Sequence, residues 1–158
     1  MSLQIEENEA KRLYDDVPPW FQKQLIKEFG QDVFIKQDFE NIKTFDDACR
    51  KCGTTEEEFN EKWNSLGLPS DTLTYEKIKI VVKAINNGWT PDWDNTNQPK
   101  YYPWFNLSSG FAFGATYYYC TDTDAGCGSR LCFESREKSD YAGQQFLELY
   151  KEFITITE

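Results

Sequence analysis

Residues 101–119 consist of YYPWFNLSSGFAFGATYYY, and nine of these side chains are aromatic rings. Tyr, Phe and Trp favour strands, and the Ser-Ser-Gly at 108–110 is typical of a turn between two strands. The segment therefore predicts an antiparallel β-hairpin. Pro103 has no N–H for a sheet hydrogen bond, so the first strand is expected to lie at an edge or to be interrupted there.

Two further elements are expected after the hairpin. Residues 129–134 predict a third strand, because Leu131 and Phe133 alternate with Arg130 and Cys132. The last expected element is a helix from about Arg136, whose apolar residues recur at helical spacing. Those residues are Ala142, Phe146, Leu149, Tyr150 and Phe153.

Helical periodicity dominates the residues before Trp89 and predicts about four helices. A weak candidate at 3–15 precedes helices at 19–29, 44–52, 55–66 and 75–86. Pro19 suits the first turn of its helix, Thr55 begins a capping-box pattern, and Thr74 is expected to cap the helix that follows it.

The 158 residues are therefore predicted to form one α+β domain. Its helical subdomain would span residues 1–88. Its aromatic-rich subdomain, residues 89–158, would hold a small antiparallel sheet of about three strands with the C-terminal helix packed on it.

Charge and composition limit the possible functions. The formal net charge is −10, which disfavours DNA-binding domains that neutralise phosphates, and the sequence has no histidine. No motif with catalytic spacing is present either, so we expect no enzymatic activity. The N-terminal residues are too charged for a signal peptide, and no apolar run is long enough for a membrane span. We therefore expect a cytoplasmic protein with reduced cysteines and no membrane partner.

Four motifs follow one another in the second half of the chain. They are NGWTPDW at 87–93, KYYPWF at 100–105, GSRLCF at 128–133 and YAGQQF at 141–146. Together they resemble an uncharacterised family from phages, prophages and mobile elements of gut anaerobes. The resemblance covers the chain from about Tyr75 onward. It implies a genomic context and transfers no catalytic residue.

The aromatic segment supports two interpretations. Alternate rings can face the core, or some can remain exposed and bind a partner, since exposed apolar patches mark interfaces. We expect protein contacts, either with a partner protein or by self-association. The alternative is a single-stranded nucleic-acid binder that stacks bases on rings beside cations. The candidate residues are Trp89, Trp93, Tyr101, Tyr102, Trp104 and Tyr118, with the cations Lys79, Lys83, Lys100 and Arg130.

Cysteines and aspartates are the candidate metal ligands of this sequence. Cys49 and Cys52 have zinc-like spacing, and Cys120, Cys127 and Cys132 could complete a four-sulfur site. Only one tight pair exists, so buried thiols are the favoured interpretation and no cofactor is expected. The weak candidates for a hard cation are Asp92, Asp94, Asp122 and Asp124. Capping of turns is favoured for them, whereas their convergence in a cleft would indicate a metal-dependent hydrolase or nuclease.

Overall fold

The computed structural model describes residues 5–34 and 38–156, and its contacts divide the chain into two compact units, Met1–Gln37 and Asp38–Glu158. The expected subdomain boundary between residues 88 and 89 stays a prediction. None of the helices in the described ranges is long and apolar enough to cross a bilayer.

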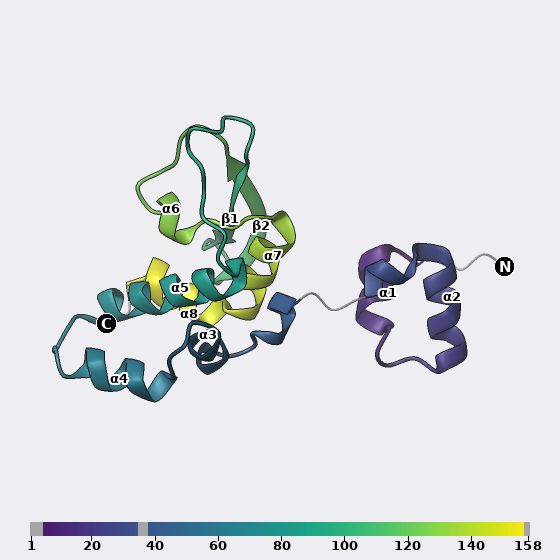
Figure 1. Ribbon diagram of the computed structural model, residues 1–158, viewed down its shortest axis with the longest axis horizontal. Helices are drawn as coiled ribbons and strands as arrows, with labels where there is room; N and C mark the ends of the chain where they lie inside the picture. The colour runs from purple at the N-terminus through teal and green to yellow at the C-terminus, as the bar shows by residue number, and fades with distance from the viewer. Residues whose placement is uncertain (1–4, 35–37, 157–158) are drawn as a thin grey trace. The chain divides into compact units, whose positions relative to one another are not determined.

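The N-terminal unit consists of two α-helices and a short 3-10 helix around a small core (Figure 1). Its helices are α1 (Glu7–Leu13), α2 (Pro19–Phe29) and the 3-10 helix η1 (Gln31–Phe34). Pro19 occupies the first turn of α2, where its missing N–H leaves no hydrogen bond unmade. Ala10 and Leu25 are buried, and the ring of Tyr14 stacks on Phe34 at a centroid distance of 4.3 Å.

The second unit begins with helices that are fixed by local caps. They are η2 (Asp38–Asn41), α3 (Phe45–Lys51), α4 (Glu56–Asn64) and α5 (Ser70–Asn86). Thr44 and Asp47 exchange hydrogen bonds in a capping box at α3, and Thr55 and Glu58 do so at α4. The predicted capping box at Thr55 is thus confirmed.

Helix α5 forms the centre of this unit. Its buried apolar residues are Ile78, Val81, Val82, Ala84 and Ile85. The prediction that Thr74 caps this helix is wrong, because α5 begins a turn earlier, at Ser70 after Pro69. Thr74 is buried inside the helix, and its hydroxyl donates to the carbonyl oxygen of Ser70 at 2.8 Å.

The predicted hairpin is confirmed as an antiparallel pair of β1 (Lys100–Asn106) and β2 (Ala112–Tyr119), with a bulge between Trp104 and Phe105. Tyr101 exchanges both backbone hydrogen bonds with Phe133 on the side of β1 away from β2. The backbone N–H and C=O groups of successive residues point to opposite sides of a strand. The nitrogen of Pro103, two residues after Tyr101, therefore points to that same outer side. Its missing N–H therefore removes no bond from the hairpin.

The prediction of a third strand at residues 129–134 is wrong, and the sheet has two strands. Residues Gly128–Leu131 form a single helical turn, α6, and only Phe133 pairs with β1. The side chain of Asn86 fixes the backbone on both sides of Phe133. Its amide nitrogen donates to the Cys132 carbonyl oxygen at 2.9 Å, and its amide oxygen accepts from the Glu134 N–H at 3.1 Å.

The expected C-terminal helix is two helices, α7 (Arg136–Gln145) and α8 (Leu147–Ile154), which meet at Phe146. Helix α7 packs against both strands, and α8 packs against α5 (Figure 1). Gly143 of α7 lies directly against Phe113 and Pro103 of the hairpin. The second unit is therefore α+β, with one face of a two-stranded sheet covered by a helix.

Candidate functional site

The two faces of the hairpin have different environments. In an antiparallel pair, residues opposite each other share a face, and neighbours along a strand lie on opposite faces. The register pairs Tyr102 with Tyr117 and Lys100 with Tyr119, while Trp104 lies on the same face, two residues beyond Tyr102. We call the rings of Tyr102, Trp104, Tyr117 and Tyr119 the aromatic face. The opposite face packs on α7.

The rings of the aromatic face form one continuous row. Tyr102 stacks on Tyr119 at a centroid distance of 4.4 Å and contacts both Trp104 and Tyr117 at about 6.5 Å. Trp104 and Tyr117 meet edge to face at 5.6 Å. Tyr102 is buried, but 53% of Trp104 and 52% of Tyr117 remain exposed. The outer half of the row is therefore available to a partner.

A buried lysine lies at the Tyr119 end of this row, because Lys100 is opposite Tyr119 in the hairpin. Lys100, expected in a phosphate-facing patch, is 0% exposed. Its ammonium donates to the carbonyl oxygens of Cys120 at 3.0 Å and Asn95 at 3.3 Å, and it lies 4.9 Å from the ring centroid of Trp93. The indole N–H of Trp93 donates to the Ser129 hydroxyl at 2.6 Å. Lys100 thus joins the loops before and after the hairpin and offers no surface charge.

The aspartates of these loops hold turns together. Asp92 accepts from the N–H groups of Asp94 and Asn95, and Asp124 accepts from those of Gly126 and Cys127. No three residues among the described His, Cys, Asp and Glu are grouped so that they could hold a metal ion.

Asp124 also marks the end of the aromatic face, where it accepts from the Tyr119 hydroxyl at 2.9 Å. Burial by itself would raise the pKa of Asp124, but the hydrogen bonds from Tyr119, Gly126 and Cys127 outweigh it and lower the pKa. Hydrogen bonding with Tyr102, together with burial and Asp124, raises the pKa of Tyr119. Asp124 is thus held in its charged form at the edge of the rings.

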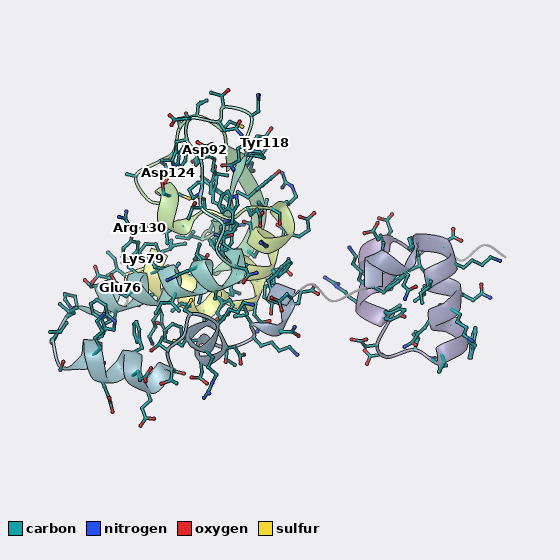
Figure 2. All side chains as sticks on the ribbon, in the orientation of Figure 1. Glu76, Lys79, Asp92, Tyr118, Asp124 and Arg130 are labelled. Carbon is teal, nitrogen blue, oxygen red and sulfur yellow. The ribbon has the colours of Figure 1, made fainter. Side chains whose placement is uncertain are left out.

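The remaining candidate cations lie on helices α5 and α6. Lys79 lies on α5, where it pairs with Glu76 at 2.6 Å and packs over the ring of Tyr75. In Figure 2, Lys79 lies well away from Tyr118 of the hairpin. Lys83 is exposed on α5, and Arg130 is exposed on α6.

The other candidate rings have mixed positions. Tyr118 is 55% exposed at the margin of the face that packs on α7, and its ring lies 5.7 Å from that of Tyr101. The guanidinium of Arg136 lies over Tyr101 and donates to the Thr116 oxygen at 2.6 Å. Trp89 is half-buried just after α5.

Tyr117 was missed as a candidate, although it is the exposed ring that contacts Trp104. The signal for it was the strand period: of the three consecutive tyrosines 117–119, the first and third share a face. Which face is outward depends on the hairpin register and on the position of α7, and neither is visible in the sequence.

All five cysteines are free thiols, and Cys49 and Cys132 are buried. Burial raises the pKa of Cys49 and of Cys132 to about 11, and that of Cys127 to about 12. Such thiols remain protonated at neutral pH and are poor nucleophiles.

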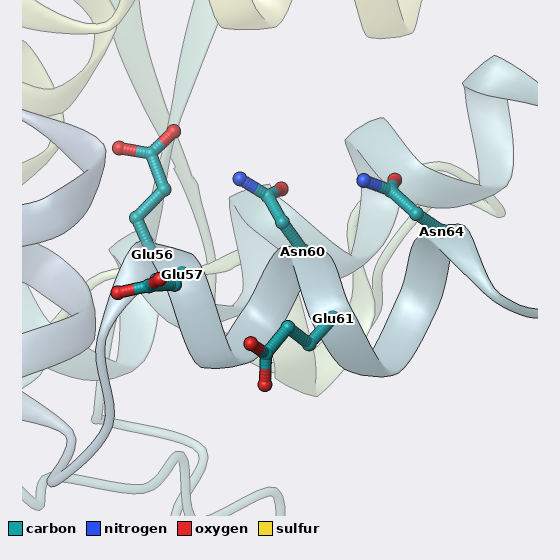
Figure 3. A pocket seen from close by; sticks show the side chains of 5 residues that line it. All are labelled: Glu56, Glu57, Asn60, Glu61 and Asn64. Carbon is teal, nitrogen blue, oxygen red and sulfur yellow. The ribbon is translucent and has the colours of Figure 1, made fainter.

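A shallow hollow lies along α4, and the residues that line it all belong to that helix. The lining residues are Glu56, Glu57, Asn60, Glu61 and Asn64. Glu56, Asn60 and Asn64 project from one side of the helix, and Glu61 from another (Figure 3). The hollow is open and acidic, and no side chain from another element converges on it.

No protein-family model, curated protein or solved structure matches this chain.

Proposed function

We propose that the chain is a non-catalytic binding protein that contacts a partner protein through the aromatic face. The exposure of Trp104 and Tyr117 carries this proposal: each side chain is more than half exposed, on the face of the hairpin opposite to the one that packs on α7. Large exposed rings are unfavourable in isolation, and Trp and Tyr are the residues that dominate the binding energy of protein interfaces.

The scaffold beneath these rings supports the proposal because it holds them in place. Tyr102 and Tyr119 stack behind them, α7 covers the opposite face, and Lys100 ties the two adjoining loops. Rings that are already ordered lose little conformational entropy when a partner binds.

The distribution of charge favours a protein over a single-stranded nucleic acid. A nucleic-acid groove combines stacking rings with cations that follow the phosphates. Here Lys100 is buried and Lys79 is paired with Glu76, while the loops beside the rings carry aspartates. The non-catalytic part of the proposal rests on the lack of histidine in the sequence and of any catalytic spacing. The proposed origin in a phage or mobile element rests on the four sequence motifs.

The test is a selection from a random peptide library displayed on yeast, with the full-length chain as bait. The counter-bait is the variant Trp104→Ala/Tyr117→Ala. A matched control is Trp20→Ala, which removes a 67% exposed tryptophan from the N-terminal unit. Circular dichroism checks that each bait is folded.

We expect peptides that bind the wild-type chain and Trp20→Ala equally but do not bind the double variant. Selection of no peptide, or of peptides that bind all three baits alike, would contradict the proposal. The same proteins are titrated with a single-stranded oligonucleotide while tryptophan fluorescence is followed. Quenching that disappears at higher salt and in Trp104→Ala would instead favour the nucleic-acid alternative. Self-association through the same rings is checked by light scattering at high protein concentration.

A further inference from the structure

The charges next to the aromatic face are nearly all negative. Between Trp89 and Phe133, the exposed charged residues are four aspartates and one cation, Arg130. The aspartates are Asp92, Asp94, Asp122 and Asp124. None of these four carboxylates forms an ion pair with a residue in the described ranges. The loops at the end of the ring row therefore carry a net negative charge, even when the buried ammonium of Lys100 and the guanidinium of Arg130 are counted.

Two rings near the aromatic face already have a cation of the chain packed over them. The ammonium of Lys100 lies over Trp93, and the guanidinium of Arg136 lies over Tyr101 at 5.6 Å. No cation from the described residues lies over Trp104 or Tyr117. These two rings have the same electron-rich faces and are open on the outside.

We infer that the aromatic face binds an extended, arginine- or lysine-bearing segment of a partner protein. This inference rests on the proposed function and specifies the chemistry of its partner. One cation would lie over Trp104 and Tyr117, and a second would approach the aspartates of the adjoining loops.

The dimensions fit a short segment. Lys100, which the loops surround, and Trp104 are four residues apart on β1, or about 13 Å at the strand rise of about 3.3 Å per residue. An extended partner segment with two cations about four residues apart spans this distance.

A second copy of this chain is a poor occupant. An interface between two copies related by a two-fold axis uses the same patch on both sides, so it would bring the aspartates of both copies into one interface. The net charge of −10 adds to that repulsion. A cationic segment has no such penalty.

The probe is a fluorescein-labelled peptide of about nine residues that alternates arginine and glycine, followed by fluorescence anisotropy with the full-length chain. The matched probe replaces each arginine with citrulline, which keeps the shape and removes the charge. We expect the arginine peptide to bind and the citrulline peptide to bind at least about tenfold more weakly. Raising the salt from ~20 mM to ~150 mM should weaken binding of the arginine peptide, because the aspartates of the loops are exposed and their charges are screened.

Two pairs of variants separate this site from attraction by net charge. Trp104→Ala and Tyr117→Ala leave the charge unchanged and should each weaken binding about three- to fivefold, whereas Trp20→Ala should not. Asp94→Asn/Asp122→Asn removes two charges beside the rings. Glu57→Gln/Glu61→Gln removes the same number from α4, and only the first double variant should weaken binding.

Equal effects of the two double variants would overturn the inference, because binding would then depend on net charge alone. So would equal binding of the arginine and citrulline peptides, or an unchanged affinity in both Trp104→Ala and Tyr117→Ala. If library peptides without cations bind the wild-type chain and not the ring variant, the proposed function stands and this inference fails. If no peptide of either kind depends on the rings, both fail.

Discussion

Gly143→Ala tests the packing that positions the aromatic face. A Cβ atom at Gly143 would lie 2.5 Å from Cδ2 and 2.8 Å from Cε2 of Phe113, and 2.9 Å from Cβ of Pro103. Non-bonded carbons prefer about 3.5–4.0 Å, so the added methyl must displace the hairpin or α7 by about 1 Å.

The size of the effect follows from two opposing terms. Overpacking a tight contact costs about 1–3 kcal/mol, whereas replacing Gly by Ala inside a helix stabilises it by about 1 kcal/mol. Pro103 belongs to a paired strand and cannot rotate away, so we place the packing cost in the upper part of its range. The expected net loss in the free energy of unfolding is about 1–2 kcal/mol, or about 3–6 °C in Tm.

Urea and thermal unfolding, followed by tryptophan fluorescence, measure this loss. Gln144→Ala is the matched control, because Gln144 is exposed on the same helix and its replacement should change stability by less than about 0.5 kcal/mol. In a double-mutant cycle, Phe113→Ala should remove most of the cost of Gly143→Ala. If Gly143→Ala instead stabilises the protein by about 1 kcal/mol, as an unhindered helical glycine would, the packing argument is refuted.

Three further predictions concern buried and capping groups. Lys100→Met should destabilise the fold by about 2 kcal/mol, because two carbonyl oxygens lose their donor, and urea unfolding with an unchanged midpoint would contradict this. The hydrogen bonds that Thr44 makes to Asp47 lower the pKa of the Asp47 carboxyl in the folded state. The stability that this carboxylate contributes is therefore fully present above its pKa in the unfolded chain, about 3.9, and is lost as pH falls through its lower pKa in the folded chain. Acid titration of α-helical circular dichroism should therefore show a smaller loss below pH ~4 in Asp47→Asn than in the wild type, and identical curves would count against the cap. Cys49 and Cys132 should react with iodoacetamide at pH ~8 only after denaturation, as followed by mass spectrometry, since burial raises their pKa values to about 11; rapid native labelling would show that they are accessible.

The sequence predicted the elements that depend on nearby residues. The capping box at Thr55 and the turn after Asn106 involve residues within a few positions of each other, so local pattern is enough to find them. The prediction of a third strand was wrong because the conformation of residues 129–134 depends on Asn86, more than forty residues away. Asn86 forms hydrogen bonds with the backbone on both sides of Phe133. That long-range contact has no signature in the alternation of Leu131 and Phe133.

The exposure of the candidate residues could be anticipated for some rings but not for Lys100. The ring density of the hairpin pointed to Trp104, and the structure leaves that ring exposed. Lysine is almost never fully buried, so no local pattern indicates that Lys100 lies beneath the loops. Its position depends on two carbonyl groups and the ring of Trp93, which converge only in the folded chain.

The edges of the hairpin have a consequence for how the protein behaves at high concentration. A ring-rich strand pair with free edges is the kind of segment that recruits further strands into cross-β aggregates. On β1, Phe133 occupies the hydrogen-bonding groups of Tyr101, and Pro103 supplies no donor. On β2, the guanidinium of Arg136 occupies the carbonyl oxygen of Thr116. Trp104 and Tyr117 can therefore stay exposed to a partner, while the edges of β1 and β2 offer few free backbone groups on which a strand of another molecule could pair.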